Sequence, residues 1–139
     1  TDKNNAYSIS WGVLLKLARI SGADFIHAGM WGGYLSDTKK DLTEWMGVLT
    51  SSNETGFKKT VPSLSCGSHP GLVKTTVKNF GNNVMMSLGG QMHGHPSGTK
   101  AGAKAMRQAF EIIKNEKLEI PKDYIEYKEA IDKWGMVND

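Results

Sequence analysis

The chain has 139 residues, of which 39% are hydrophobic and 22% charged, with a formal net charge of +3. This composition is typical of one small globular domain, and it excludes collagen-like and largely disordered chains. The positive charge is modest and scattered along the chain, so nucleic acid is not expected as a partner. No apolar run approaches the roughly 20 residues that cross a bilayer, so a membrane is not expected as a partner either.

The first half of the chain predicts two helices with a short strand between them. Apolar side chains recur at helical spacing over residues 8–20 and 38–49, and residues 23–27 form a short strand closed by glycine. The side chains expected to face the core are Val13, Leu14, Leu17, Ala18 and Ile20 in the first helix, and Leu42, Trp45, Met46 and Leu49 in the second.

The second half repeats this alternation of strand and helix. Residues 61–65 and 82–88 predict two further strands, and a helix is expected to begin at Pro70, where a missing N–H costs nothing. Residues 98–114 and 121–134 predict two more amphipathic helices, the last with Trp134 in its core face. Short apolar strands separated by helices indicate parallel strands, and therefore an α/β fold.

Glycine and histidine gather where each predicted strand ends. Because the carboxyl ends of parallel strands meet at one edge of a sheet, this edge is where α/β proteins place their ligand sites. Residues 89–97 predict a glycine-rich loop before a helix, which would aim bare backbone N–H groups at an anion. The sequence therefore indicates a phosphate-binding site. The residues concerned are His27 and Gly29, Gly67 and His69, and Gly89, Gly90, His93 and His95.

Four ordered motifs carry a resemblance to a known family. They are SGADFIHAG at residues 21–29, SCGSHPGL at 65–72, GGQMHGHP at 89–96 and GAKAMRQA at 102–109. Their combination is similar to the C-terminal part of the large subunit of ribulose bisphosphate carboxylase (RuBisCO), and resembles the RuBisCO-like proteins still more closely. The resemblance implies that residues 1–120 are about strands six to eight, with their helices, of a (β/α)8 TIM barrel. Residues 121–139 would be a C-terminal helical extension.

The resemblance also assigns roles at the phosphate site. His27 looks like the strand-six histidine that contacts one substrate phosphate, and Ser65 looks like the strand-seven serine that helps to hold the substrate. Gly67, Gly89 and Gly90 look like the glycines whose backbone N–H groups bind the other phosphate. A Cβ at such positions would keep the backbone amides away from the anion.

One position departs from the carboxylase pattern. Carboxylases carry a lysine in the loop after strand six, and the matching residue here is Tyr34, whose neutral phenol cannot supply that positive charge. Cys66 also stands where carboxylases usually have glycine. The resemblance therefore implies enolisation or isomerisation of a phosphorylated sugar-like substrate of the methionine-salvage type, such as 5-methylthioribulose 1-phosphate or its diketo relative. A carboxylase with an altered loop and a non-catalytic fragment are the alternatives.

The same family implies a cofactor and an assembly. Its members bind Mg²⁺ through a Lys-x-Asp-Glu pattern whose lysine is carbamylated. This pattern does not occur in the sequence. The Mg²⁺ ligands are therefore expected outside this chain, and no complete metal site is expected within it. A homodimer or larger homo-oligomer is implied by the family's intersubunit active sites. The single cysteine favours a reducing, cytoplasmic location. The start of the chain, without Met or a signal-peptide pattern, is expected to lie within a longer sequence or after processing.

The remaining candidate residues have simpler interpretations. His93 and His95 are expected to fix their loop by hydrogen bonds, since a third zinc ligand with suitable spacing is missing. His69 is interpreted as a capping or packing residue and Cys66 as a small buried one. Trp31 and Tyr34 are candidates for a lid or a subunit contact, and Lys100 and Lys104 for solvated surface charges.

Overall fold

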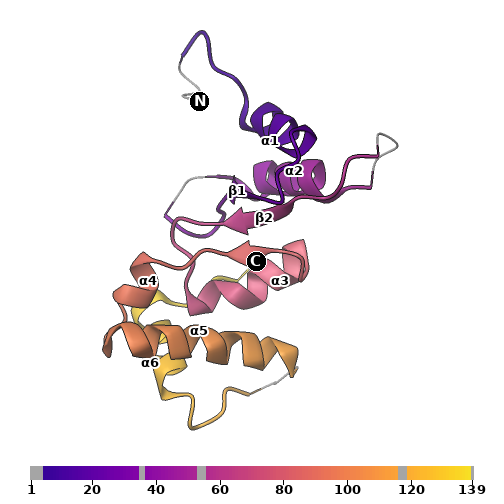
Figure 1. Cartoon of the computed structure of the whole chain (residues 1–139). Coiled ribbons are helices and arrows are strands. Elements are labelled where there is room, and N and C mark those ends of the chain that lie inside the picture. Colours follow the sequence, from indigo (N-terminus) through magenta and orange to yellow (C-terminus); the bar gives the residue numbers. More distant parts are fainter. Residues whose placement is uncertain (1–4, 35–36, 53–55, 116–118, 139) are drawn as a thin grey trace.

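A computed structural model describes residues 5–34, 37–52, 56–115 and 119–138. It confirms the α/β fold: three parallel strands form one sheet in the order β1-β2-β3. The elements follow one another from α1 at the top of Figure 1 to α5 and α6 at the bottom. They are α1 (Trp11–Ile20), β1 (Phe25–Gly29), α2 (Lys39–Thr50), β2 (Val61–Leu64), the 3-10 turn η1 (Pro70–Leu72), α3 (Val73–Phe80), β3 (Met85–Met86), α4 (Gly90–His93), α5 (Gly98–Lys114) and α6 (Ile125–Trp134).

The strand register aligns the carboxyl ends of all three strands. His27 of β1 pairs with Ser63 of β2, and Ser63 pairs with Met85 of β3. The buried Ser63 hydroxyl lies 2.7 Å from that of Ser87, the residue after β3, which links the two neighbouring strands. The register of β1 shifts between His27 and Gly29, so the chain leaves the sheet with an irregular turn at the edge where the site is expected.

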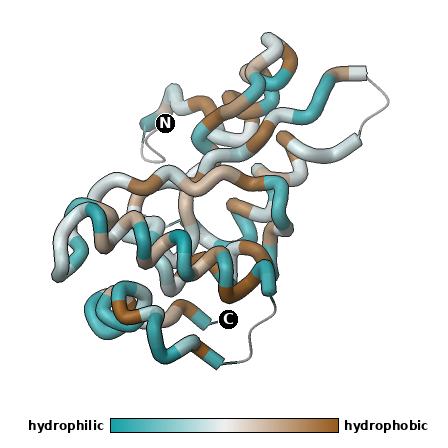
Figure 2. The backbone as a smooth tube through the Cα atoms, turned by 60° about the horizontal axis from the view of Figure 1, so that its bottom comes forward, coloured by the Kyte–Doolittle hydropathy of each residue, from teal (hydrophilic) through white to brown (hydrophobic). Residues whose placement is uncertain are grey.

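Two apolar clusters hold the helices to the sheet. Brown hydrophobic and teal hydrophilic positions alternate along the helices in Figure 2, as expected for elements with one buried side. No helix among the described residues is long and apolar enough to span a bilayer. The buried members of the larger cluster are Leu15, Ala28, Met30, Leu42, Met46, Leu49, Leu64 and Leu72, and those of the smaller one are Val73, Met106, Ala109 and Tyr127.

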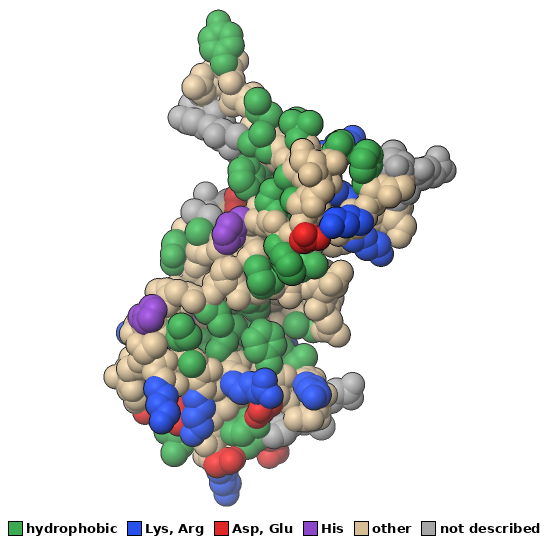
Figure 3. Space-filling view, in the orientation of Figure 1, with side chains coloured by type: hydrophobic (Ala, Val, Ile, Leu, Met, Phe, Trp, Pro, Cys, Tyr) green, Lys and Arg blue, Asp and Glu red, His purple; other side chains and the backbone are tan. Residues whose placement is uncertain are grey.

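The α1 helix buries a different face from the one its periodicity predicts. Val13, Leu17 and Ile20 are 48%, 53% and 45% exposed, whereas Leu15 and Arg19 are buried. The physical reason is that α1 packs on α2 through the side that carries Arg19, so its apolar stripe faces outward. Hydrophobic side chains accordingly gather over the upper part of the molecule in Figure 3, while charged ones form a band over α5 and α6.

Arg19 is the main buried charge of this half of the chain. Its guanidinium donates to the backbone carbonyls of Val48, Ser51, Phe57 and Lys58 at 2.7 to 3.1 Å. Val48 and Ser51 lie at the C-terminal end of α2, where carbonyls lack partners within the helix. The arginine therefore caps α2 and ties it to the segment that leads into β2.

Several predicted boundaries are wrong. The strand expected over residues 82–88 is reduced to Met85–Met86, because within the described part of the chain β3 pairs with β2 alone. The expected loop at 89–97 contains the short helix Gly90–His93, and the last helix begins at Ile125 rather than at residue 121. Trp45 and Trp134, expected in the core, are only half-buried.

Hydrogen bonds between α5 and α6 converge on Glu126. Lys104 Nζ donates to one carboxylate oxygen at 2.6 Å, and the buried Gln108 donates to the other at 2.9 Å while accepting from the Tyr127 N–H. Lys104 is 58% exposed, as expected for a surface charge, and it also pairs with the Glu126 carboxylate. His95 accepts from the Ser97 N–H at Nδ1, so its Nε2–H donates to the Glu126 carbonyl, which confirms its loop-fixing role.

The bond from Lys104 is the main cause that lowers the pKa of Glu126, from 4.5 to about 2. A carboxylate with a lowered folded-state pKa stabilises the fold fully above its unfolded pKa, and this contribution is lost as pH falls towards the folded value. We expect the urea midpoint to fall between pH 4.5 and 2, with a smaller decrease in Glu126→Gln. Titration by NMR should show Lys104→Met raising the Glu126 pKa, whereas Lys100→Met, one helical turn earlier, should not change it. An unchanged pKa in Lys104→Met would contradict this account.

Candidate functional site

A cavity of about 310 Å³ opens where β2 and β3 end. It brings together four of the residues predicted to bind phosphate, Ser65, Gly67, Gly89 and Gly90, and adds Tyr34 from the loop after β1. Three segments distant in sequence thus meet at one edge of the sheet, as parallel strands require. The remaining lining residues are Cys66, Ser87, Leu88 and Gln91.

The glycines around this cavity differ in what surrounds them. A Cβ on Gly89 or Gly90 would meet nothing within 4 Å, so their backbone faces open space in the cavity region. Gly67 has φ +113, and a Cβ there would lie 2.7 Å from the Tyr34 nitrogen and 2.8 Å from the Gly33 Cα. Packing therefore requires glycine at position 67, whereas no neighbouring protein atom excludes a side chain at positions 89 and 90.

The loop that carries Tyr34 rests directly on the end of β2. The Tyr34 N–H donates to the Cys66 carbonyl at 3.2 Å, and a Cβ on Gly33 would lie 2.4 Å from that oxygen. Cys66 itself is half-buried with φ +76, so the prediction of a small buried residue is wrong: its backbone turns the chain towards the loop. The Tyr34 side chain is 72% exposed above this contact, and its role as a lid stays a prediction.

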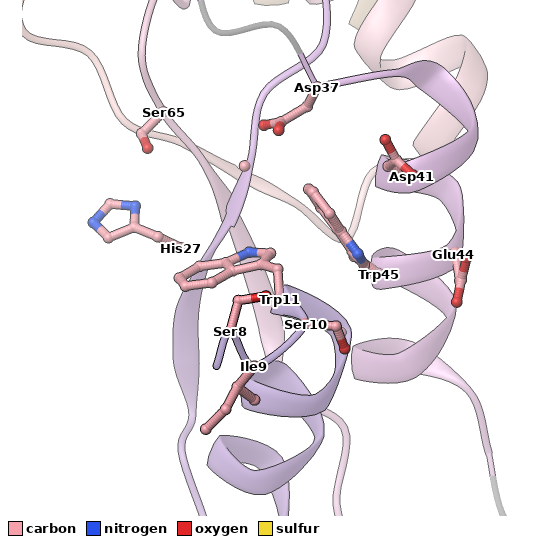
Figure 4. A pocket seen from close by; sticks show the side chains of 12 residues that line it. Ser8, Ile9, Ser10, Trp11, His27, Asp37, Asp41, Glu44, Trp45 and Ser65 are labelled. Carbon is pink, nitrogen blue, oxygen red and sulfur yellow. The ribbon is translucent and has the colours of Figure 1, made fainter. Parts of the chain in front are cut away.

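His27 lies in a second, larger cavity of about 680 Å³ (Figure 4). Ser65 lines both cavities, so the two share a wall at the end of β2. The indole rings of Trp11 and Trp45 stand between His27 and the carboxylates of α2 in this view. The other lining residues are Ser8, Ile9, Ser10, Gly12, Gly29, Asp37, Asp41 and Glu44.

Asp37 holds the start of the loop in place. Its Oδ2 accepts a hydrogen bond of 3.0 Å from the Met30 N–H. A Cβ on Gly29 would lie 2.7 Å from the same oxygen and 2.9 Å from the Trp45 ring, so glycine is needed for this close approach. The Asp37 carboxylate thus holds the start of the loop beside β1, and the Cys66 carbonyl holds Tyr34 beside the end of β2.

The described residues do not form a Mg²⁺ site. They contain no group of three histidine, cysteine, aspartate or glutamate side chains that could hold a metal ion, and Asp37 already accepts the Met30 N–H. The residues present therefore do not fit the ion that the family resemblance implies. Any metal chemistry would need ligands from outside the described parts of this chain.

The remaining histidines have structural roles. His93 Nδ1 lies 3.2 Å from the Thr99 hydroxyl, which joins α4 to the start of α5 as predicted. His69 is buried with its ring centroid 6.2 Å from that of Trp134, and this burial lowers its pKa. Its packing role is confirmed, but its side chain makes no capping bond at η1.

Comparison with known proteins places this chain in a family. Residues 1–134 match the family described as ribulose bisphosphate carboxylase large chain, catalytic domain. The chain belongs to this family. The ribulose bisphosphate carboxylase of Pyrococcus furiosus is 34% identical over 137 residues, and the 2,3-diketo-5-methylthiopentyl-1-phosphate enolase of Bacillus cereus strain G9842 is 35% identical over 131.

The match covers nearly all of this chain but only part of its RuBisCO-family relatives. It covers 97% of this chain and 32% of the Pyrococcus enzyme, and 93% of this chain and 31% of the Bacillus enzyme. The solved octameric RuBisCO of Pyrococcus horikoshii, in complex with sulfate ion, superposes with a TM-score of 0.84 at 30% identity, covering 98% of this chain and 32% of that one. The chain therefore spans about one third of the length of these relatives, and carboxylases and an enolase match it equally well.

Sequence reasoning missed most of the larger cavity. Trp45 was predicted for the core from its helical spacing, and Trp11, Asp37, Asp41 and Glu44 were not singled out. Spacing along one helix does not show that the starts of α1 and α2 lie side by side. The pair of tryptophans, Trp11 at the start of α1 and Trp45 in the middle of α2, was the signal available.

Proposed function

We propose that this chain supplies the phosphate-binding part of an enolising active site in the RuBisCO family. The observation that carries the proposal is the smaller cavity, which gathers Ser65, Gly67, Gly89 and Gly90 at the ends of β2 and β3. Backbone N–H groups at glycines allow a phosphate to approach closely. His27 and Ser65 would hold the rest of the substrate in the neighbouring cavity.

The residue at position 34 favours enolisation over carboxylation. Both reactions begin with removal of a proton next to a carbonyl, but carboxylation adds a negatively charged group that a cation would stabilise. Tyr34 lies at the mouth of the phosphate cavity and carries a phenol there. The substrate class we propose is a phosphorylated sugar-like ketone of the methionine-salvage type, and the reaction an enolisation or isomerisation.

The rest of the active site would come from elsewhere. We propose that residues 1–120 form about strands six to eight of a TIM barrel, with residues 121–139 as a helical extension. The Mg²⁺ ligands and the remaining strands would lie outside this chain. A homodimer or larger homo-oligomer is part of the same proposal, supported by the octameric state of the Pyrococcus horikoshii relative, and a cytoplasmic location is proposed with it.

The test is proton exchange in deuterated water, followed by NMR. We expect the native protein, with every segment that accompanies this chain and with Mg²⁺ added, to exchange the proton beside the carbonyl of 2,3-diketo-5-methylthiopentyl 1-phosphate. Gly90→Ala should slow this exchange at least tenfold with an unchanged melting temperature, because a methyl group there meets no protein atom but fills the anion site. Gly47→Ala, equally uncrowded but far from the cavity on α2, is the matched control and should leave exchange unchanged.

The second candidate is carboxylation of ribulose bisphosphate. It is favoured by the 34% identity to the Pyrococcus furiosus carboxylase, which is close to the 35% identity to the enolase. Incorporation of labelled CO₂ with ribulose 1,5-bisphosphate would establish it and overturn the enolase proposal. Absence of both exchange and incorporation would leave the third alternative, a non-catalytic fragment.

A further inference from the structure

We infer that the Ser87 hydroxyl donates to the phosphate in the smaller cavity, and that the buried Ser63 is the positioning residue that turns this proton towards the ligand. As a result, the site selects the dianionic form of a phosphate ester. This inference rests on the proposed function, because it takes the smaller cavity as the phosphate site. Neither serine lies in the four sequence motifs that carry the family resemblance.

The sheet places Ser87 at the cavity. This residue follows β3 directly, and its N–H donates to the Leu64 carbonyl of β2 at 2.8 Å. Because the N–H is committed to the sheet, the hydroxyl is the donor that Ser87 can offer to a ligand. Ser87 is half-buried and lines the smaller cavity together with Gly89 and Gly90. An anion held in this cavity can therefore accept a hydrogen bond from the hydroxyl.

The direction of the Ser87 proton follows from its neighbour. The Ser63 side chain is buried, and its hydroxyl oxygen lies 2.7 Å from that of Ser87, its one side-chain partner among the described residues. If Ser87 were the donor of this pair, the buried Ser63 proton would have no acceptor, an arrangement that buried hydroxyl groups avoid. Ser63 is therefore the donor, and the Ser87 proton is left to point into the cavity.

The direction of these hydrogen bonds selects the ionic form of the ligand. The described residues that line the smaller cavity include no carboxylate, lysine, arginine or histidine. The backbone N–H groups of Gly89 and Gly90 are donors, as is the Ser87 hydroxyl once Ser63 orients it. These donors pair with the bare oxygens of a phosphate dianion. A monoanion brings a P–OH proton that finds no acceptor among them, so the dianion binds more tightly.

The test follows the binding of methyl phosphate at two pH values. The second pKa of a phosphate monoester is about 6, so the dianion falls from nearly all of the ligand at pH 7.5 to about a tenth at pH 5. Calorimetry on the native protein, with every segment that accompanies this chain, should show an affinity about tenfold lower at pH 5. In Ser63→Ala, where the Ser87 hydroxyl can turn and accept, this decrease should be less than threefold.

Sulfate is measured alongside methyl phosphate at both pH values. It stays a dianion over this range, so a change in its binding reports titration of protein groups beside the ligand. Among the described residues, these are Tyr34 and Cys66 on the cavity lining and His27 in the adjoining cavity. The ratio of the two affinities therefore isolates the ionic form of the phosphate ester.

Three further variants complete the test. Ser87→Ala should weaken methyl phosphate binding at pH 7.5 at least fivefold, and Ser63→Ala added to it should change the affinity no further. Thr60→Val is the matched control, because it also removes a buried hydroxyl, one that donates to the Ala23 carbonyl at the other end of β2. It should leave both the affinity and its pH dependence unchanged.

The outcomes separate this inference from the proposed function. A pH dependence that Ser63→Ala does not alter, or an unchanged affinity in Ser87→Ala, would overturn the role of the two serines while the phosphate site stands. Failure of the native protein to bind both methyl phosphate and sulfate would overturn the phosphate site itself, and the inference with it.

Discussion

Replacing Arg19 with methionine is expected to destabilise the fold by about 3–5 kcal/mol, because it leaves four backbone carbonyls without their donor. Methionine keeps much of the volume and the unbranched shape, so the loss reflects hydrogen bonds more than a cavity. These carbonyls belong to the end of α2 and to the segment before β2. Without the arginine, no side chain among the described residues would hold these two parts of the chain together through hydrogen bonds. Urea unfolding at neutral pH measures the change in the free energy of unfolding.

Arg107→Met is the control for Arg19→Met. The Arg107 side chain is 77% exposed and pairs with Glu111 four residues later on the same helix, at 3.1 Å. An exposed pair of this kind stabilises a helix by only about 0.3–0.5 kcal/mol. A loss of less than about 1 kcal/mol in Arg19→Met would show that water replaces the arginine at these carbonyls, and would contradict a capping role.

Gly67→Ala is expected to disrupt the phosphate cavity and to cost about 2–4 kcal/mol of stability. The residue has φ +113, which disfavours any side chain, and the new methyl group would lie 2.7 Å from the Tyr34 nitrogen. The loop would have to move off the end of β2, breaking the hydrogen bond from Tyr34 to Cys66. We expect phosphate affinity to fall at least tenfold in the same variant.

Gly22→Ala separates the cost of the positive φ from the cost of the steric clash with the Tyr34 loop. Gly22 has φ +90, but a Cβ there would meet nothing within 4 Å. It should therefore lose only the backbone contribution, about 1–2 kcal/mol, with unchanged phosphate affinity. Equal losses of stability in the two variants, without a change in phosphate binding, would show that the contact between the loop and β2 has no part in forming the site.

The residues whose location was predicted well share one property: the order of strands and helices along the chain is enough to define where they lie in the fold. Gly67, Gly89 and Gly90 follow strands whose carboxyl ends must coincide in a parallel sheet, so their meeting around one cavity follows from the order of elements. His27, on the neighbouring strand, lies in the adjoining cavity instead. Which of them contact a substrate stays a prediction.

The failures came from contacts between elements. Periodicity identified the apolar stripe of α1 correctly but not which side would be covered, since the packing of α1 on α2 buries Arg19. A charged residue in a helix is normally expected at the surface, and only the carbonyls left free at the end of α2 explain its burial. Asp37 was missed for a similar reason, because its partner is a backbone N–H in another part of the loop.

The order of the sheet has a consequence for how the chain is assembled. Because β1, β2 and β3 are neighbours in both sequence and space, each strand can pair with the one made just before it, and the sheet can grow in the direction of synthesis on the ribosome. One contact breaks this sequence of events. Val137 hydrogen-bonds through its N–H to the Gly71 carbonyl and through its carbonyl to the Thr75 hydroxyl, so the turn after β2 is completed only by a residue that follows Thr75 by 62 positions.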